Sequence, residues 1–508
     1  MSTSSRVIKN TIYLYIKSIV SMVVMLFVTR IVLQMLGVVD YGIYNVIAGS
    51  IALLVFFRNS MAVTMQRYLN HYQGEENFDR QKQVFNIGIV FHWGVAFILV
   101  VFFIFLGIIL FNGILNIPED RVSAAKVVYV CLIVNTFLTV ITAPYDATIT
   151  SHENMLFYSI VGIFESFLKL GVAFAIIYID GDKLVSYAIM MMVIPFIETA
   201  TMRIYCKLKY EECVFRPMKE WDGDLAKEMI GFAGWSLVGS SASVIGNHGA
   251  NIALNHFFGA AINAVAGIAN QIQGVLAVLL NGLIKSITPV IFKTEGSGNM
   301  SNMVKISLLG CKYSTLLFSL LAIPVYVYAP EVLTIWLGDV PEWTILFVRL
   351  QLIRAFVEQL GLSLQNSLNA TGKIRQLNIF SCIYNLLPIV ILIVLYNMGC
   401  SPYWHYIVMI VVLSMGQNLT LILLCKKFCT LSVKKYMSHV FIPCLAVLIS
   451  FLPLFIIKNL MGVGIISFII SGIVFILVYL IIVYFGLSTS EKQYFAQSVL
   501  SYKPFHKD

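Results

Sequence analysis

Charged residues are scarce in this chain. Only 12% of its 508 residues are Asp, Glu, Lys or Arg, whereas soluble domains carry about 25%. Apolar and aromatic residues make up 59%, and the mean hydropathy is +0.87. A soluble protein of this length would need a polar surface for roughly two to four domains. The composition supplies no such surface, so the sequence predicts a protein that crosses a membrane many times.

Signatures of catalysis are absent as well. The nine cysteines are odd in number and scattered, so they predict no disulfide framework. No GxxxxGK[ST] loop occurs, which excludes ATP hydrolysis by this chain. The eight histidines do not cluster at ligand spacing, so we expect no metal and no cofactor. The net charge of +9 is spread over short loops, which argues against a nucleic-acid partner. We therefore predict that the protein is not an enzyme.

Long apolar runs, in contrast, recur throughout the sequence. A membrane-spanning helix needs about 20 mainly apolar residues, and about fourteen such runs are present. The predicted fold class is therefore an all-α polytopic membrane protein. The connection 206–228 is long and follows six predicted helices. It divides the chain into an N-terminal lobe (1–205), the inter-lobe loop (206–228), a C-terminal lobe (229–425), two further helices (438–486) and a tail (487–508).

The distribution of Lys and Arg predicts the orientation. Alternate inter-helix segments hold 22 basic residues on one side and four on the other. Positively charged short loops stay in the cytoplasm. Both termini are therefore predicted to be cytoplasmic.

An internal repeat supports the division into two halves. Leu36-Gly37 has a counterpart in Phe258-Gly259, 222 positions later. The turn 150–153 similarly matches the turn 370–373 at an offset of 220. Because each half has an even number of helices, the two lobes are expected to have the same orientation.

Charges inside the predicted spans are the candidate functional residues. Arg30, Arg58 and Arg349 have no acidic neighbour one helical turn away and lie well inside their spans. A buried arginine is costly in lipid and usually faces a wet cavity. A guanidinium can grip phosphate through two parallel hydrogen bonds. These arginines therefore favour an anionic cargo.

Two acidic residues, Glu165 and Glu358, are candidates for coupling transport to an ion. Each has a basic residue four positions away, Lys169 and Arg354 respectively. Such i,i+4 pairs can neutralise each other on one helix face, so each pair is either structural or functional. Lys17, near a predicted cytoplasmic end, is expected to extend to the interface.

Amides are dense in the second half. Asn251, Asn270 and Gln273 lie in predicted helices 7 and 8. Amides at this density can bind sugar hydroxyls across a wet cavity. They can equally serve hydrogen bonding between helices. We treat these three as candidate substrate ligands.

Two segments carry a family resemblance. The segment 36–45, Leu-Gly-Val-Val-Asp-Tyr-Gly-Ile-Tyr-Asn, resembles the junction of helices 1 and 2 in bacterial polysaccharide exporters. These are the oligosaccharide-lipid flippases of the multidrug/oligosaccharidyl-lipid/polysaccharide (MOP) superfamily. The segment 368–375 is similar to their turn between helices 10 and 11. The loop after helix 6 and the two extra C-terminal helices extend the resemblance over the whole chain.

The resemblance implies two six-helix bundles forming a V around a central cavity. It also implies a flippase that moves an undecaprenyl-diphosphate-linked oligosaccharide across the bacterial inner membrane for surface polysaccharide assembly. Arg30 and Arg58 occupy the helices on which relatives place arginines. Lys285 is the one counterpart of a cation expected on helix 8. Membrane lipids and other polysaccharide assembly proteins are the further partners it suggests.

Two alternatives remain open at this stage. One is a cation-coupled drug or metabolite exporter of the same superfamily, and the other is a membrane glycosyltransferase or polymerase. The sequence also leaves open whether a proton gradient, a sodium gradient or the membrane potential drives transport.

Overall fold

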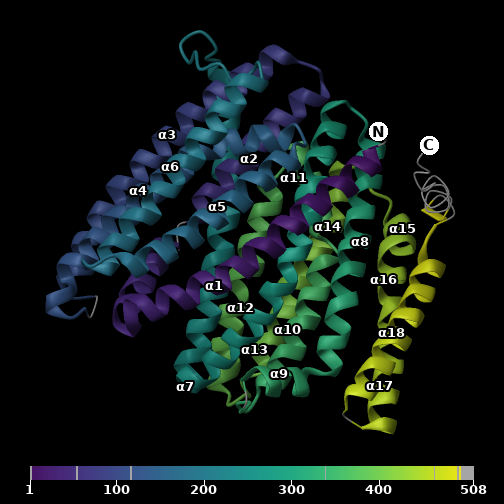
Figure 1. Ribbon diagram of the computed structural model, residues 1–508. Helices are drawn as coiled ribbons and strands as arrows, with labels where there is room; N and C mark the ends of the chain where they lie inside the picture. Colours follow the sequence, from purple (N-terminus) through teal and green to yellow (C-terminus); the bar gives the residue numbers. More distant parts are fainter. Residues whose placement is uncertain are drawn as a thin grey trace, which may run out of the picture. The chain divides into compact units, whose positions relative to one another are not determined.

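The computed structural model describes residues 3–52, 55–114, 117–337, 339–462, 464–488 and 491–492. Throughout these ranges the regular structure is helical and no strand occurs, which confirms the predicted all-α fold class (Figure 1). The chain begins with α1 (Thr3–Ala52), α2 (Val55–Gly74), α3 (Phe78–Ile109), η1 (Leu110–Ile114), η2 (Glu119–Arg121), α4 (Val122–Ser151), α5 (Met155–Ala175), η3 (Ile176–Tyr178), α6 (Lys183–Lys209) and α7 (Gly223–Gly296).

The remaining helices follow the long helix α7. They are α8 (Met300–Val327), α9 (Ala329–Leu337), α10 (Thr344–Gln359), α11 (Leu362–Thr371), α12 (Arg375–Asn397), α13 (Trp404–Val408), η4 (Met409–Met415), α14 (Gly416–Phe428), α15 (Val433–Tyr436), η5 (Met437–Phe441), α16 (Ile442–Ala446), η6 (Val447–Ser450), α17 (Phe451–Met461) and α18 (Ile465–Gly486).

The chain divides into two compact units. Unit 1 comprises residues 1–244 and 285–299, and unit 2 comprises residues 245–284 and 300–508. Both ends of α7 thus belong to unit 1 and its middle to unit 2. The predicted lobes 1–205 and 229–425 were drawn by counting helices, and their limits stay a prediction.

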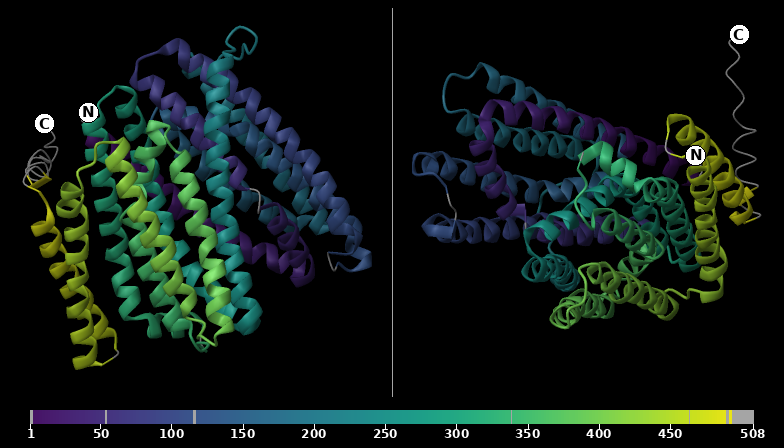
Figure 2. Two further views of the ribbon diagram at one scale, coloured as in Figure 1. Left: turned by 180° about the vertical axis from the view of Figure 1, so that it is seen from behind. Right: turned by 90° about the horizontal axis from the view of Figure 1, so that it is seen from below.

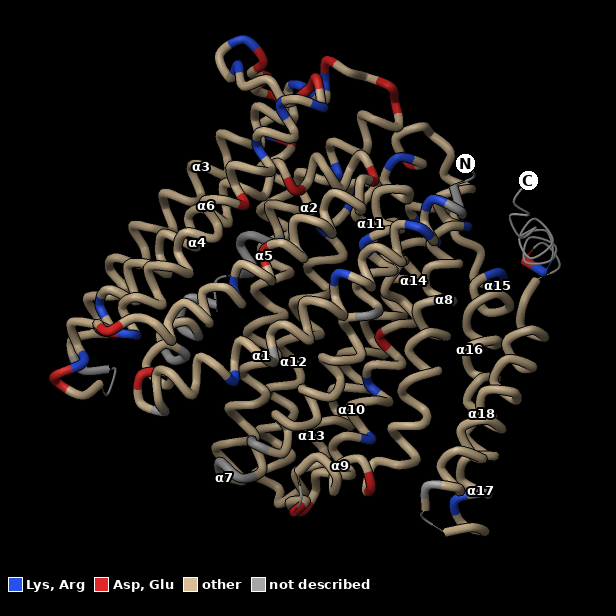
Figure 3. The backbone as a smooth tube through the Cα atoms, in the orientation of Figure 1, with Lys and Arg blue, Asp and Glu red and all other residues tan. Residues whose placement is uncertain are grey.

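Most of the predicted membrane spans are found as long apolar helices. Eleven described helices are long and apolar enough to cross a membrane, and a bent pair within α7 would make twelve. Large apolar side chains such as Ile98 and Phe105 are more than 60% exposed, as lipid-facing residues would be. Figure 3 shows the charged residues concentrated toward helix ends, with long uncharged stretches between them. These features support a multi-pass membrane protein.

Two of the apolar runs predicted from the sequence, residues 41–64 and 343–368, are not among these helices. Residues 53 and 54 of the first run lie outside the described residues, so this test does not decide it. The predicted span 343–368 is divided at Leu360 and Gly361 between α10 and α11. α10 has 16 residues and α11 has 10, so each is too short to count as a membrane span, and α10 also carries Arg349, Arg354 and Glu358. The expected number of about fourteen is therefore higher than the number of long apolar helices in the described ranges.

A glycine breaks each of the two longest helices in the same way. Gly37 in α1 has φ 77° and ψ 170°, and Gly259 in α7 has φ 81° and ψ 178°. Positive φ values of this kind are open to glycine and strained for other residues. The two glycines are the residues that the sequence repeat pairs at an offset of 222. The structure therefore gives the repeat the same local backbone at both positions.

The repeat continues at the next turn of the chain. Glu76, two residues after the end of α2, has φ 56°, and Gly298, two residues after the end of α7, has φ 75°. The backbone bond from Asn77 N–H to Tyr72 O (2.9 Å) is matched by the bond from Asn299 N–H to Thr294 O (3.1 Å). Each of these residues is 222 positions from its counterpart. The second predicted match is shifted by one position, since the positive-φ residues are Glu153 and Gly372.

The ends of α2 and α7 cross closely within unit 1. A Cβ atom added at Gly74 would collide with the backbone oxygen of Lys293 and lie 2.8 Å from the backbone nitrogen of Ser297. A Cβ atom at Gly296 would collide with the backbone oxygen of His71. Beside this crossing, His71 Nδ1 is 2.7 Å from Glu295 Oε2. The crossing depends on glycine at both positions, because backbone atoms cannot move aside as a flexible side chain can.

Apolar packing and one ionic cluster hold the rest of unit 1 together. Its core joins α1, α3, α4 and α6 through buried residues such as Val32, Phe103 and Val128. At one end, Arg121 contacts carboxylates from two other elements. Its Nε donates to Asp40 at 2.8 Å and its Nη1 donates to Asp182 at 2.8 Å. Partial burial acts to raise the pKa of Asp182, but the hydrogen bonds from Arg121 and from backbone N–H groups bring it below its ordinary value.

The C-terminal helices of unit 2 pack against α8. Figure 2 shows α17 and α18 as an antiparallel pair. Val447, Leu454, Phe475 and Tyr479 form a core with residues of α8. Lys312 on α8 is 2% exposed and donates to the backbone oxygen of Gly486 (2.9 Å) and to Glu491 (2.9 Å). The tail predicted over 487–508 lies mostly outside the described residues.

Candidate functional site

A polar cavity lies along the middle of α7 in unit 2. Its volume is about 540 Å³. Asn251 and Asn270, two of the three predicted amide ligands, line it, whereas Gln273 is not part of the lining. The remaining lining residues are His248, Ile252, Asn255, His256, Asn263 and Gly267.

The break at Gly259 explains how one helix can line a hollow on both sides. The lining residues before it, 248–256, and after it, 263–270, belong to the two arms of α7. A straight helix presents a convex surface, and the kink allows both arms to face one space. Glycine is needed at the bend because of its positive φ. The sequence repeat had pointed to Gly259 without indicating that it bounds a cavity.

The described residues that line this cavity are neutral amides, two imidazoles and small or apolar groups. Amides offer both donors and acceptors, and a neutral imidazole offers one of each. That inventory suits a ligand rich in hydroxyl groups. Among the described residues, no group of three or more His, Cys, Asp or Glu is arranged to hold a metal ion.

Arg30 lies in α1 within a long apolar helix, and its side chain is exposed. No carboxylate lies within ion-pair distance of Arg30 among the side chains that the structure describes. Arg58 is part of α2, but its side chain lies outside the described residues. Of the two arginines predicted to line a central cavity, only Arg30 can therefore be characterised.

The other two predicted cations have local partners. Arg349, in unit 2, donates from Nε to the backbone oxygen of Tyr326 at 3.1 Å, and its guanidinium lies 5.3 Å from the Tyr326 ring centroid. Lys285, in unit 1, lies 3.8 Å from Asp146 Oδ1 and 3.5 Å from the ring centroid of Tyr158. Their role as substrate ligands stays a prediction.

The two candidate coupling carboxylates each pair with the basic residue one turn away. Glu165 Oε1 is 2.6 Å from Lys169 Nζ. Glu358 Oε1 accepts from Arg354 Nε at 2.9 Å and from Ser414 Oγ at 3.1 Å. Arg354 also donates to Asn247 Oδ1 at 3.2 Å. Each carboxylate is thus held by a cation on its own helix, which favours a structural role for both.

Replacing Glu165 by Gln and Lys169 by Met together is expected to leave transport and its pH response unchanged. Swapping an ion pair for neutral residues of similar size is often tolerated. The measurement is transport in proteoliposomes at several external pH values. If Glu165→Gln alone uncouples transport from a pH gradient while substrate still binds, Glu165 carries the coupling proton and the structural assignment is wrong.

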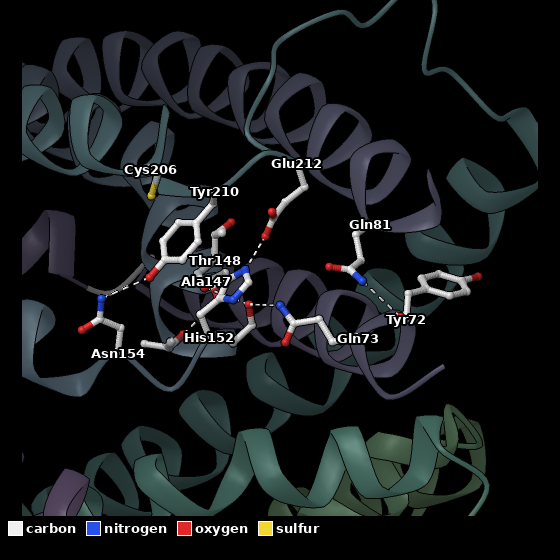
Figure 4. Close-up of polar contacts among 12 residues, drawn as sticks. Tyr72, Gln73, Gln81, Ala147, Thr148, His152, Asn154, Cys206, Tyr210 and Glu212 are labelled. Atoms are coloured by element: carbon white, nitrogen blue, oxygen red, sulfur yellow. Dashed lines mark hydrogen bonds and ion pairs between the residues drawn. The ribbon is translucent and has the colours of Figure 1, made fainter. Parts of the chain in front are cut away.

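A polar network that sequence reasoning missed surrounds the corner between α4 and α5 (Figure 4). His152 Nε2 is 2.5 Å from Glu212 Oε1, and the His152 ring stacks on Tyr210 with centroids 4.1 Å apart. Asn154 Nδ2 donates to the Tyr210 hydroxyl at 3.1 Å, and Gln73 Nε2 donates to Ser151 Oγ at 3.2 Å. In the sequence, only the repeat that includes the turn 150–153 pointed to this corner. The network fixes the loop after α6 against the α4 end.

No protein-family model and no curated protein matches the chain. Solved structures do match it. A MATE transporter in the bent conformation aligns with a TM-score of 0.75 and 13% identity, over 85% of this chain and 96% of that chain. A MATE transporter in the straight conformation gives a TM-score of 0.74 and 13% identity, over 85% and 97%. A MOP superfamily transporter from Pyrococcus furiosus gives 0.71 and 12%, over 83% and 96%.

The chain has the fold of MOP superfamily transporters. The fold agrees with the one that the sequence resemblance implied, and two of the matching structures are described as transporters. At identities of 12–13% the likeness concerns the fold alone. The function must therefore be argued from the chain's own side chains.

Proposed function

We propose that this protein is a flippase for an undecaprenyl-diphosphate-linked oligosaccharide. The observation that carries the proposal is Arg30, an exposed guanidinium within an apolar helix that has no described carboxylate partner. Such a charge is costly in lipid unless water or an anion compensates it. A diphosphate supplies that anion and matches the guanidinium in geometry.

The pairing of the acidic residues supports the same cargo. Glu165, Glu358 and Asp146 each lie within 4 Å of a Lys or Arg. A carrier of cationic drugs would need a carboxylate available to its cargo. In this chain these three carboxylates are already engaged by basic residues, whereas Arg30 is available to an anion.

The amide-lined cavity along α7 is the proposed site for the glycan. Asn251 and Asn270 would hydrogen-bond sugar hydroxyls, with Gln273 nearby on the same helix. Arg30 and Arg58, with Lys285 and Arg349, would serve the diphosphate, while the polyprenyl tail stays in lipid. Alternating access then requires that the cargo binds the two states with different affinity. A proton gradient, a sodium gradient or the membrane potential would bias those states.

The proposed location is the bacterial inner membrane, with both termini in the cytoplasm. Polysaccharide assembly proteins and membrane lipids would be its partners. Cysteine labelling in a cysteine-free background tests the orientation. A cysteine at position 400 should react from outside, and Glu211→Cys should react only after permeabilisation. Glu211 is exposed, whereas Cys213 is 6% exposed and would label poorly on either side. External labelling at position 211 would reverse the orientation.

The decisive experiment is deletion of the gene in its host. We expect the lipid-linked oligosaccharide to accumulate on the cytoplasmic side while surface polysaccharide disappears. Re-expression of the wild-type protein should restore both. A deletion strain with normal surface polysaccharide and no such accumulation would contradict the proposed cargo.

A cation-coupled drug exporter is the second candidate. One matching structure is described as a multidrug resistance MATE family transporter. This candidate predicts export of cationic dyes from vesicles, abolished by Glu165→Gln. Sugar transfer by the purified protein would instead indicate the glycosyltransferase alternative.

A further inference from the structure

Two lysines from distant parts of the sequence lie over the ring of one tyrosine in unit 1. Lys17 Nζ, on α1, is 4.0 Å from the ring centroid of Tyr158 on α5. Lys285 Nζ, near the end of α7, is 3.5 Å from the same centroid. The two ammonium groups can therefore be no farther apart than the sum of these distances. An aromatic ring attracts each cation, but the two cations repel each other.

The local anions do not balance this pair. Asp146, on α4, lies 3.8 Å from Lys285, which is an ion pair beyond hydrogen-bond distance. Its Oδ1 is buried without a hydrogen-bond partner among the described residues. No carboxylate lies within 4 Å of Lys17 in the part of the chain that the structure describes. Lys285 thus pairs with Asp146, whereas Lys17 has no described carboxylate within ion-pair distance.

The fold holds Lys17 in this position. A Cβ atom at Gly162, one turn after Tyr158 on α5, would collide with Lys17 Cε and lie 2.8 Å from its Nζ. Glycine at position 162 therefore makes room for the lysine stem. On either side of Lys17, α1 is tied to its neighbours by hydroxyl pairs. The hydroxyl oxygens of Thr11 and Ser286 are 2.7 Å apart, and those of Ser21 and Ser166 are 2.8 Å apart. A side chain that merely extended into solvent would not need a glycine on the neighbouring helix to make room for it.

A second group of cations lies at the adjacent end of the same helices. Glu153, whose side chain is 5% exposed, receives Lys293 at 3.0 Å and Arg6 at 3.6 Å. Asn10 also donates to the Glu153 backbone oxygen at 3.0 Å. The charge pattern of the first group is repeated, with two cations for one carboxylate. Both groups lie at the end of unit 1 that the distribution of Lys and Arg predicts to face the cytoplasm.

We propose that Lys17, Tyr158 and Lys285 form a binding site for a phosphoryl group, where the diphosphate of the lipid cargo is first captured from the cytoplasmic leaflet. The inference rests on the proposed function for the identity of the cargo. Each lysine offers three donors on a compact charge, and phosphoryl oxygens are strong acceptors. A diphosphate can contact both ammonium groups and supply the missing negative charge. Arg30, farther along α1, is then available for a later stage of transport.

The test measures binding of farnesyl diphosphate, a soluble prenyl diphosphate, to the purified full-length protein in detergent. Lys17→Gln and Lys285→Gln should each weaken binding at least about tenfold. Tyr158→Phe keeps the ring and should bind nearly as wild type, whereas Tyr158→Leu should be weaker. Gly162→Ala leaves all charges in place but displaces Lys17, so it should also weaken binding. Lys17→Arg, which keeps the charge, should retain most of the affinity.

The control variant is Lys207→Gln, which removes an exposed lysine from the last turn of α6 and should leave binding unchanged. Each variant's melting temperature shows whether it is folded. Wild-type affinity in both Lys17→Gln and Lys285→Gln would overturn the site, as would an equal loss in Lys207→Gln. If Lys17→Gln unfolds, Gly162→Ala takes its place in this comparison, and wild-type affinity in Gly162→Ala and in Lys285→Gln would overturn the site. Loss of affinity in a folded Lys17→Arg protein would also count against it.

Competitors distinguish the possible sources of the phosphoryl group. Inorganic pyrophosphate should displace farnesyl diphosphate, because recognition is of the headgroup, and failure to do so would overturn the proposal. Phosphatidylglycerol should displace it only weakly. Equal displacement would identify a general site for anionic lipid and overturn the diphosphate assignment. A wild-type protein that flips lipid-linked glycan while both lysine variants bind normally would refute the site alone. No binding and no flipping by the wild type would refute the proposed function.

Discussion

Alanine at position 74 is expected to destabilise unit 1 by about 1–3 kcal/mol, because the added methyl group overpacks the crossing of α2 with the end of α7. The obstructing atoms are backbone atoms of residues 293 and 297. Relief therefore requires the two helices to move apart, which would also strain the contact between His71 and Glu295. Gly296→Ala should have a similar effect, since its obstruction is the backbone oxygen of His71. The measurement is the thermal unfolding midpoint of the purified protein.

Gly231→Ala is the matched control for this prediction. Gly231 lies on α7 in the same unit, and nothing lies within 4 Å of a Cβ added there. Alanine at an open helical position stabilises by up to about 1 kcal/mol relative to glycine. The two substitutions should thus shift the midpoint in opposite directions. A Gly74→Ala protein that unfolds at the wild-type temperature would mean that the helices do not cross as closely as described.

Replacing Arg30 with alanine is expected to reduce transport of the lipid-linked oligosaccharide about 100-fold, while the amount of folded protein stays near that of the wild type. The reduction corresponds to about 3 kcal/mol, the magnitude of charge-assisted hydrogen bonds to a phosphoryl group. Stability should not fall, because Arg30 has no described carboxylate that its loss would leave unpaired. Flipping by purified protein in proteoliposomes measures the first effect, and the melting temperature measures the second.

Lysine at position 30 separates charge from geometry. An ammonium keeps the positive charge but cannot form the two parallel bonds of a guanidinium. We expect activity between that of the wild type and that of Arg30→Ala. Lys126→Ala, which removes an exposed lysine from α4, serves as the control and should transport normally. Normal transport by Arg30→Ala would place the diphosphate elsewhere and remove the main support for an anionic cargo.

The helices were predictable because a membrane imposes one strong requirement on the sequence. About 20 apolar residues are needed for each span, and most predicted spans correspond to long apolar helices. The exception at 343–368 arises because the helix is divided at Leu360 and Gly361 into α10, of 16 residues, and α11, of 10 residues. The hydropathy of a sequence does not register such a division of the backbone.

The backbone breaks at Gly37 and Gly259 could be located from the sequence repeat, because a glycine retained at equivalent positions points to a conformation that other residues adopt poorly. The position of the Lys17 side chain could not be predicted in the same way. It depends on Gly162 and on the ring of Tyr158, which are one turn apart on α5, and both are far from Lys17 in sequence. Sequence alone therefore favoured a lysine that extends to the interface. The polar corner at His152 was missed for the same reason, since two helices, α5 and α6, separate it in sequence from its partner Glu212.

The crossing of α2 with the end of α7 is reciprocal. Gly74 meets residue 293, and Gly296 meets residue 71, and each residue of one contact is 222 positions from its counterpart in the other. Such reciprocity is the property of a contact between two identical subunits related by a two-fold axis. A half-length ancestor would need only one copy of this surface to pair with itself. After duplication and fusion, His71 and Lys293 could diverge while both glycines were kept. The crossing thus has, within a single polypeptide, the reciprocal arrangement of a two-fold interface.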